Sequence, residues 1–522
     1  MQNGRRNESQ AGQAREAGKA ALVPRRKAPA ILAGCALALA GLSAIGAEPG
    51  TAQGFAPAPI QPLWVAAEPD PPPPPPAAPK RDWTREIEAR KSYGVPIAEI
   101  VGFDVLLNRY NYAHEGGGDY RVNARTIRDN LRHRWVVDND PYSINQFMHP
   151  YQGSMYHGFA RSAGLNYWEA LGYTFTGSAF WEIFGENTPP SKNDQVASGI
   201  AGTFLGEALF RMANLMLERD DGWPQWAHEV AAAAISPPVG FNRLAFGDRF
   251  KTVFPSHDPE YYSRLSLGAS TTTQNNQGPS SKLKRNEGVA DFSMDYGLPG
   301  KPDYTYKRPF DYFTIKATVA SGNGFENILT HGLLVGRDYK AGPNFRGIWG
   351  VYGSYDYIAP QIFRISSTAL SLGTTGQYWL SDNIAMQGTG LLGIGYAAVG
   401  TLHSSADPAE ERDYHYGVAP QALIALRMIF GDKYSLDLTG REYFVSKLGA
   451  ANDTGGNDNI ARLDAALTWR ITGKHAVSLR YLLSRRDASY LGTSDRSQTR
   501  GTIGIYYTLL GHDRFGALDW RR

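Results

Sequence analysis

The residues of this chain that could do chemistry are concentrated between positions 145 and 211. Five imidazole and carboxylate side chains are the candidates for catalysis: His149, His157, Glu182, Glu186 and Asp194. Imidazole and carboxylate groups transfer protons near neutral pH and are ordinary ligands of zinc. The five residues predict either a hydrolytic site or a metal site. Because no H-E-x-x-H motif occurs, the sequence does not identify the metal or any other cofactor.

The same side chains fit a purely structural role. Residues four apart share one face of a helix, which groups the charges into stacked pairs. These pairs are His157 with Arg161, Glu182 with Glu186, and Glu207 with Arg211. Buried charges need partners, so the alternative to a catalytic site is a buried polar network that joins several helices. In this network Arg161, Glu207 and Arg211 are structural, and the two arginines pair with Glu182 and Glu186.

The elements that position these residues follow a helical period. We expect helices near 153–163, 167–186, 191–219 and 224–235. Ser191 followed by Asp194 is typical of a helix N-terminus with an acid in its first turn. Gly199, Gly202 and Gly206 give the third helix a smooth side, where another helix can approach closely. Upstream, the alternation at 101–107 and the Trp135-Val136-Val137 run predict two strands.

This region resembles a known bacterial family, domain-of-unknown-function family 3943. The resemblance depends on rare residue types at fixed spacings over about residues 100–250. The motifs are His149-Pro150-Tyr151-x-Gly153-x-x-Tyr156, Ala160-Arg161-x-x-Gly164, Trp181-Glu182-x-x-x-Glu186, Pro190-Ser191-x-x-Asp194 and Gly202-x-x-x-Gly206-Glu207. The resemblance implies an envelope protein with this domain ahead of a strand-rich C-terminus. It implies no activity, because the family has none assigned.

Downstream, apolar and polar residues alternate over a dozen short segments. In the segment 461–472, Leu463 and Leu467 share one face, and Arg462 and Asp464 share the other. A period of two predicts strands with two different environments. We place these strands near 261–271, 288–297, 310–321, 326–339, 344–358, 361–379, 382–401, 412–430, 434–447, 460–472, 475–487 and 499–510.

Twelve is an even number, as bacterial single-chain outer-membrane barrels require. The predicted fold is therefore mainly β: a transmembrane antiparallel barrel of about twelve strands, preceded by a small helical domain. A soluble sandwich or lipocalin-like barrel also alternates, but it turns its apolar face inward. The mature sequence has no run of about 20 apolar residues, so a helical membrane protein is not expected.

The charged face of the strands has two interpretations. Lys316, Arg462, Arg470 and Arg480 against Asp437 and Asp464 could select solutes in a narrow channel. Alternatively, these charges neutralise one another in a packed interior and hold the strands in register. Because a barrel of about 12 strands is narrower than an open porin, we favour the packed interior, with the helices in the lumen or at its periplasmic mouth.

The N-terminus is typical of an export signal. A basic stretch ending in Arg25-Arg26-Lys27 precedes an apolar stretch that ends at Ala47, which predicts a signal peptide at 1–47, or else a membrane anchor. Cys35, the only cysteine, lies in a lipoprotein-like Leu32-Ala33-Gly34-Cys35 sequence, or is simply a small residue within the signal. Residues 48–90 form a proline- and alanine-rich linker. The expected domains are 95–250, mixed and helical, and 258–512, the barrel.

These expectations combine into an outer-membrane protein of a Gram-negative bacterium with a structural or envelope-biogenesis role. A membrane-embedded hydrolase acting on lipid or lipopolysaccharide and a narrow channel remain the alternatives. The expected partners are outer-membrane lipids and the barrel-assembly machinery. A net charge of +3 without a basic stripe gives no indication of nucleic-acid binding. The oligomeric state is not encoded in any recognisable pattern.

Overall fold

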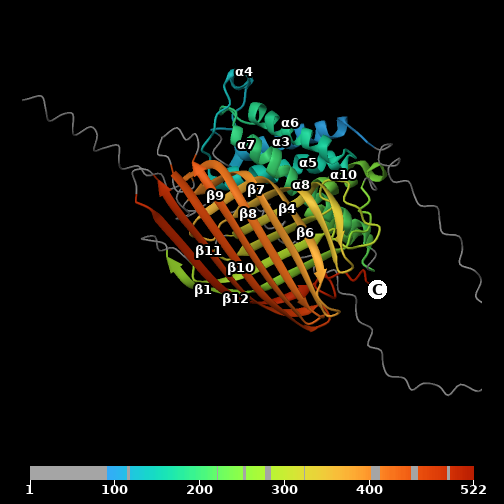
Figure 1. Cartoon of the computed structure of the whole chain (residues 1–522). Coiled ribbons are helices and arrows are strands. Elements are labelled where there is room, and N and C mark those ends of the chain that lie inside the picture. Colours follow the sequence, from blue (N-terminus) through green and yellow to red (C-terminus); the bar gives the residue numbers. More distant parts are fainter. Residues whose placement is uncertain are drawn as a thin grey trace, which may run out of the picture.

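The computed structural model describes residues 91–114, 118–219, 222–250, 254–276, 284–322, 324–400, 412–447, 456–490 and 494–521. The expected signal peptide, most of the linker and Cys35 lie outside these residues. Within them, a helical domain precedes a closed β-barrel, and Figure 1 shows the helices gathered on one side of the barrel strands.

The barrel has twelve antiparallel strands, as the alternation predicted. Each strand pairs with its neighbours in sequence, and β1 pairs with β12 to close the wall. The strands are β1 (Tyr261–Asn276), β2 (Asn286–Tyr296), β3 (Phe313–Ala320), β4 (Gly324–Ala341), β5 (Phe345–Ile358), β6 (Arg364–Trp379), β7 (Ile384–Gly400), β8 (Tyr414–Phe430), β9 (Tyr434–Lys447), β10 (Gly456–Thr472), β11 (His475–Tyr490) and β12 (Arg496–Leu510).

The helical domain contains the four helices expected from the periodicity and further ones. Its elements are α3 (Gly94–His114), α4 (Ala124–Arg132), η1 (Ile144–Met148), α5 (His149–Ser162), α6 (Tyr167–Phe184), α7 (Lys192–Val196), η2 (Ala197–Ala201), α8 (Gly202–Glu218), α9 (Gln225–Ile235), α10 (Pro237–Phe246) and η3 (Gly247–Arg249). None of the helices in the described part of the chain has the length and apolar character needed to span a bilayer.

Two expected strands in this domain are wrong. Residues 101–107 lie inside helix α3, and Val136 makes only an isolated parallel bridge with Ser191. Helix α3 buries Ile100 together with the polar residues Asp104 and Asn108. Its buried face is therefore largely polar, so the apolar residues do not mark its helical period.

The two faces of strand β5 show on which side of the barrel wall the helices lie. Asp356 points into the lumen, where its Oδ2 accepts a hydrogen bond at 3.1 Å from Arg441 Nη1 on β9, a strand that is not adjacent to β5. Successive side chains of a strand point to opposite faces. Gly353 has the opposite parity, and a Cβ built on it would lie 2.5 Å from the ring of Phe204 on α8. Helix α8 therefore packs against the outer surface of the wall.

Neighbouring contacts agree with this placement. The Tyr355 hydroxyl donates to the Gln146 carbonyl of η1 at 2.6 Å, and Phe147 packs edge-to-face on Tyr357 with 5.7 Å between ring centroids. One buried apolar cluster combines α8 with the outward faces of β2 and β3, including Phe204, Phe210, Phe292, Phe313 and Ile315. The expectation that the helices fill the lumen or its mouth is therefore wrong, because the apolar stripe of α8 pairs with the apolar outer face of the strands.

Candidate functional site

Helices α5 and α8 form the centre of the helical domain, and glycines let them cross closely. A Cβ on Gly202 would lie 2.6 Å from the Cα of Gly153, and a Cβ on Gly206 would lie 2.9 Å from the Cβ of His157. No side chain fits between the two helices at these positions. The glycine side predicted for the third helix is thus the place where α5 and α8 cross. Two separate groups of charged residues assemble around these helices.

The first group surrounds Glu207, which is completely buried. Its carboxylate accepts hydrogen bonds from Arg161 Nε at 2.7 Å and Arg211 Nε at 2.8 Å, and it lies 3.0 Å from His157 Nε2. Burial alone raises a carboxyl pKa, but the neighbouring Arg161 and His157 hold the pKa of Glu207 well below its usual range. This group is a charge-neutralised structural network.

The network also fixes the helical domain to the barrel. Arg211 Nη1 donates to Asp311 Oδ1 at 3.0 Å, and Arg211 Nη2 donates to the Pro309 carbonyl at 2.6 Å. Both acceptors lie in the connection between β2 and β3. Both arginines therefore pair with Glu207 or with barrel residues, and not with Glu182 and Glu186 as the sequence-based network had it.

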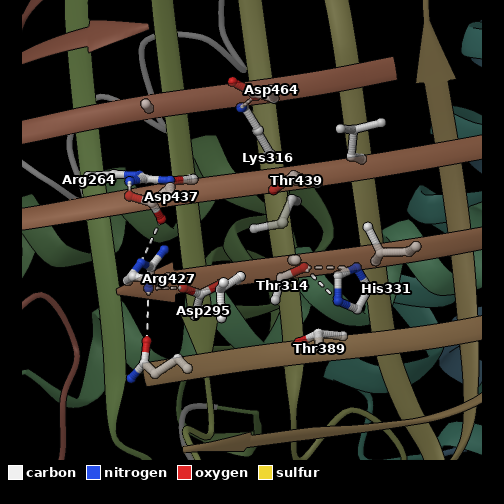
Figure 2. A pocket seen from close by; sticks show the side chains of 18 of the residues that line it. Arg264, Asp295, Thr314, Lys316, His331, Thr389, Arg427, Asp437, Thr439 and Asp464 are labelled. Carbon is white, nitrogen blue, oxygen red and sulfur yellow. Dashed lines mark hydrogen bonds and ion pairs between the residues drawn. The ribbon is translucent and has the colours of Figure 1, made fainter. Parts of the chain in front are cut away.

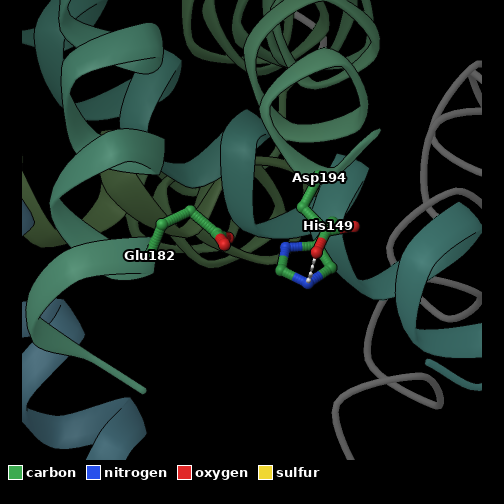
Figure 3. A group of neighbouring side chains, drawn as sticks. All are labelled: His149, Glu182 and Asp194. Atoms are coloured by element: carbon green, nitrogen blue, oxygen red, sulfur yellow. Dashed lines mark ion pairs between the residues drawn. The ribbon is translucent and has the colours of Figure 1, made fainter. Parts of the chain in front are cut away.

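The second group consists of His149, Glu182 and Asp194. One ligand atom of each residue lies within 4.8 Å of the other two, and all three side chains are buried (Figure 3). His149 begins α5, Glu182 lies near the end of α6, and Asp194 lies in the short helix α7. Three elements that are distant in sequence thus supply one nitrogen and two carboxylate donors at one place.

Serine groups orient these three side chains. His149 Nδ1 lies 3.2 Å from Ser198 Oγ, which leaves Nε2 directed at Asp194 Oδ2, 3.6 Å away. The Ser191 backbone N–H donates to Glu182 Oε2 at 2.8 Å, and Ser191 Oγ accepts from the Asp194 backbone N–H at 3.2 Å. The predicted cap at Ser191 therefore also positions two of the acidic residues.

A polar chain that the sequence interpretation missed connects this group to the barrel. Asn193 Nδ2 donates to Asp138 Oδ1 at 2.7 Å, to Asp194 Oδ1 at 3.1 Å and to the Tyr416 hydroxyl at 2.8 Å. Asn145 Nδ2 donates to the same Asp138 oxygen at 2.6 Å. Asp138 directly follows the Trp135-Val136-Val137 run, for which the sequence predicted a strand. Only the adjacency of Asn193 to Asp194 could have indicated the chain.

The protonation states in this group follow from burial. Burial lowers the pKa of His149 to about 4, so the imidazole is neutral at pH 7. Burial, together with the nearby Asp138 and Glu182, raises the pKa of Asp194 well above its usual range. Burial and Glu186 do the same for the pKa of Glu182. When several buried acids lie together without a cation, the carboxyl groups are expected to keep their protons. A neighbouring imidazole is then expected to be neutral.

The remaining two candidates are not part of this group. His157 belongs to the Glu207 network. Glu186 accepts hydrogen bonds from Trp181 Nε1 at 2.7 Å and from Thr188 Oγ1 at 3.1 Å, and burial raises its pKa to about 7. The structure thus brings together three of the five residues proposed for catalysis, and their exposed fractions are 5% for His149, 3% for Glu182 and 3% for Asp194. Such burial leaves little access for a substrate.

The lumen of the barrel contains a second concentration of charges (Figure 2). Lys316 Nζ lies 3.0 Å from Asp464 Oδ2, across the lumen from its own strand β3. Asp437 takes hydrogen bonds from Arg264 Nη1 at 2.9 Å and Arg427 Nε at 2.7 Å. Two further lumen arginines are ion-paired as well: Arg480 with Asp291 and Asp464, and Arg462 with Glu326. The charges neutralise one another, around a cavity of about 190 Å³.

One end of the barrel has the short turns 342–344, 431–433 and 473–474 and also the long β2–β3 connection, 297–312, and we name it the turn end. The segment 511–521 folds back into the lumen there. Its Gly516 carbonyl accepts from Gln387 Nε2 at 2.7 Å, and its Leu518 carbonyl accepts from Trp379 Nε1 at 2.8 Å. Phe515 is fully buried. This segment therefore occupies the lumen at the turn end.

The opposite end has three further long connections, 277–285, 401–413 and 448–455, and we name it the loop end. Here the β5–β6 connection, 359–363, enters the lumen. Its Ile362 carbonyl accepts from Gln498 Nε2 at 2.6 Å, and its Pro360 carbonyl accepts from Arg500 Nη1 at 2.9 Å. Ile362 is fully buried in an apolar cluster. The central charges thus lie between two folded-in segments.

Comparison with solved structures finds other barrels at low similarity. NanC porin is 9% identical, with a TM-score of 0.23, over 47% of this chain and 98% of that one. The outer membrane channel DcaP of Acinetobacter baumannii is 8% identical, with a TM-score of 0.22, over 48% of this chain and 97% of that one. Such scores add nothing to the barrel that the strand pairing already defines. No curated protein matches the chain.

One family model matches, and its range contains both groups of charged residues described above. It is the model of the domain of unknown function DUF3943, over residues 134–238. That range runs from the segment before Asp138 to the start of α10. The resemblance drawn from the His149, Trp181 and Gly202 motifs is thereby confirmed: residues 134–238 match the DUF3943 model.

Proposed function

We propose that this chain is an outer-membrane protein in which a closed barrel anchors the DUF3943 domain within the cell envelope, in a structural role and not as a channel. The observation that most supports this is the apolar outer surface of the barrel. Leu372, Leu392 and Ile424 point outward with exposed fractions of 61%, 71% and 69%. Water solvates such a band poorly, whereas hydrocarbon solvates it well.

Aromatic residues add to this argument. Outward-facing aromatic side chains are exposed near the turn end of the strands: Tyr378, Phe430, Tyr434, Trp469 and Tyr507. Such rings favour the boundary between hydrocarbon and headgroups, because one edge is apolar and the other polar. The expected partners are therefore membrane lipids and the machinery that inserts barrels.

The interior supports anchoring over transport. The charges around Asp437 and Asp464 are paired across the lumen, and folded segments occupy both ends. A solute would have to break several partly buried ion pairs, and removing one partner of a buried pair costs about 3–5 kcal/mol. A membrane-embedded hydrolase is also less well supported, because His149, Glu182 and Asp194 are buried.

The orientation in the membrane follows from the connections. In bacterial barrels the short turns face the periplasm and the longer loops face the exterior. The contacts of the helical domain with Tyr355 of β5 and Tyr414 of β8 lie toward the loop end. At the turn end, Arg211 contacts the β2–β3 connection, so the helical domain runs along the outer wall from the turn end to the loop end. We therefore place the part that contacts Tyr355 and Tyr414 toward the cell exterior.

The direct test is to fractionate membranes and then record conductance. The folded protein should appear in the outer membrane and migrate differently on gels with and without boiling. In planar bilayers it should produce no steady unitary currents. Reproducible conductance steps would contradict the closed lumen, and recovery of the folded protein in the soluble fraction without detergent would contradict the anchor.

A further inference from the structure

Three carboxylates, Asp138 and the buried Glu182 and Asp194, gather next to His149. Elsewhere, buried carboxylates such as Glu207 and Glu287 lie against arginines. Among the described residues, no lysine or arginine forms an ion pair with Asp138, Glu182 or Asp194. Several acids thus share one dry site without a cationic side chain, an arrangement that is costly unless protons or a cation neutralise it.

The histidine supports a cation over protons alone. His149 is buried, and its Nδ1 is hydrogen-bonded to the Ser198 hydroxyl. Its Nε2 points at Asp194, beyond hydrogen-bond range. Figure 3 shows the ring between the carboxyl groups of Glu182 and Asp194. A hydrogen bond from the second ring nitrogen of a metal-bound histidine is the usual way in which its orientation is fixed. In addition, Oδ1 of the buried Asn145, whose amide donates to Asp138, has no hydrogen-bond partner.

We propose that His149, Glu182 and Asp194 bind one first-row divalent metal ion, for which Zn²⁺ is the best match. The donor set of one imidazole and two carboxylates suits Zn²⁺, whereas Mg²⁺ prefers an all-oxygen shell with several waters. Asp138 lies next to Asp194 and supplies further negative charge. This inference concerns the helical domain alone and does not depend on the proposed membrane anchoring.

The position of the site indicates a structural ion. The metal would join the start of α5, the end of α6 and α7, and Asn193 would connect it to Tyr416 of the barrel. A buried, closed site is typical of structural zinc, whereas catalytic zinc keeps an open position for water. Its loss should therefore loosen the attachment of α7 and lower the stability of the helical domain.

The test uses the full chain purified in detergent and stripped with a chelator. Titration with Zn²⁺ should load about one ion per chain and raise the melting temperature, and Mg²⁺ at the same concentration should do neither. The variants Asp194→Asn and His149→Gln should weaken Zn²⁺ binding by at least ~100-fold, since loss of an outer-shell partner alone costs 10–100-fold. Glu218→Gln is the control, because Glu218 is a helix carboxylate that accepts from the Ser256 backbone N–H and lies outside the site; it should bind Zn²⁺ like the wild type.

Zinc-edge X-ray absorption of the wild-type protein gives a readout that does not depend on how the variants fold. One imidazole with oxygen ligands is the expected shell. A wild-type protein that binds no Zn²⁺, variants that bind it as well as wild type, or a shell without imidazole would each overturn the proposal.

Discussion

Arg211 of α8 donates to Asp311 of the β2–β3 connection at 3.0 Å, with both side chains almost completely buried. The same arginine donates to Glu207 one helical turn away, at 2.8 Å. One guanidinium therefore belongs to the interior of the helical domain and to its junction with the barrel. The buried charge of Arg211 therefore joins the helical domain to the barrel, because it needs acceptors from both.

Replacing this arginine should destabilise the whole protein. We expect Arg211→Ala to lower the free energy of unfolding by about 3–5 kcal/mol, because it leaves Glu207 and Asp311 buried with one partner fewer. Denaturant unfolding of the detergent-solubilised protein measures this. Arg485→Ala is the control: Arg485 forms an exposed pair with Asp487, which is worth less than about 1 kcal/mol. Equal effects of the two variants would contradict the buried junction.

Gly353 tests the packing of α8 on the outer wall. A methyl group there would lie 2.5 Å from the Phe204 ring, so Gly353→Ala should push the helix outward and cost about 1–3 kcal/mol. Gly390 of β7 has the same outward parity, and a Cβ on it meets no atom within 4 Å. Gly390→Ala should therefore leave the melting temperature nearly unchanged. If both variants melt like wild type, the helix does not rest on this wall.

The orientation can be read from cysteine labelling in cells. Arg128 on α4 and Asp432 in a turn at the opposite end are both exposed. We expect Arg128→Cys to react with a membrane-impermeant maleimide on intact cells, and Asp432→Cys to react only after the outer membrane is permeabilised. The reverse pattern would invert this orientation. Cys35, the only cysteine of the sequence, lies in the expected signal peptide, which keeps the background low.

Asp104 of α3 should make stability depend on pH. Burial raises its pKa to about 8, although the Tyr156 hydroxyl donates to it at 2.5 Å. A carboxyl with a raised pKa in the folded state stabilises the fold fully below its unfolded pKa, near 4, and this stability is lost as pH rises through about 8. The loss is at most about 1.4 kcal/mol per pH unit for one proton.

Thermal unfolding between pH 5 and pH 9 checks this sign. The wild type should melt at progressively lower temperature as the pH rises, and Asp104→Asn should flatten the profile and be the more stable form at pH 9. Part of the slope should remain, because burial also raises the pKa of Glu99 to about 8. A wild-type profile that rises with pH would contradict the assignment.

The barrel could be predicted from sequence because its strands have two chemically different sides. Leu463 faces outward and Arg462 faces the lumen, and the same contrast recurs in other strands, as with Leu479 and Arg480. Helix α3 could not be predicted in the same way. It buries Glu99, Asp104 and Asn108 and exposes Val105 and Leu106, the reverse of the usual amphipathic pattern. Hydrophobic periodicity fails where the buried face is polar.

The candidate site was predicted only in part. The chemistry of His149, Glu182 and Asp194 is evident from residue types, but the partner of each arginine is not. Glu207 takes Arg161 and Arg211 because glycines set the crossing of α5 and α8, and the crossing distance depends on tertiary packing. The contribution of Tyr416 could not be predicted for a different reason. Its contact with Asn193 joins positions 223 residues apart in sequence.

The cover that α8 places over β3, β4 and β5 changes what a bilayer would meet. An uncovered cylinder is ringed by acyl chains on every side. Here the ring of lipid around the barrel would be incomplete. Lipid would contact the bare strands, and the helical domain would cover the rest of the circumference. The molecule would then be asymmetric in the plane of the membrane. Only the side with bare apolar strands would be accessible to neighbouring membrane proteins.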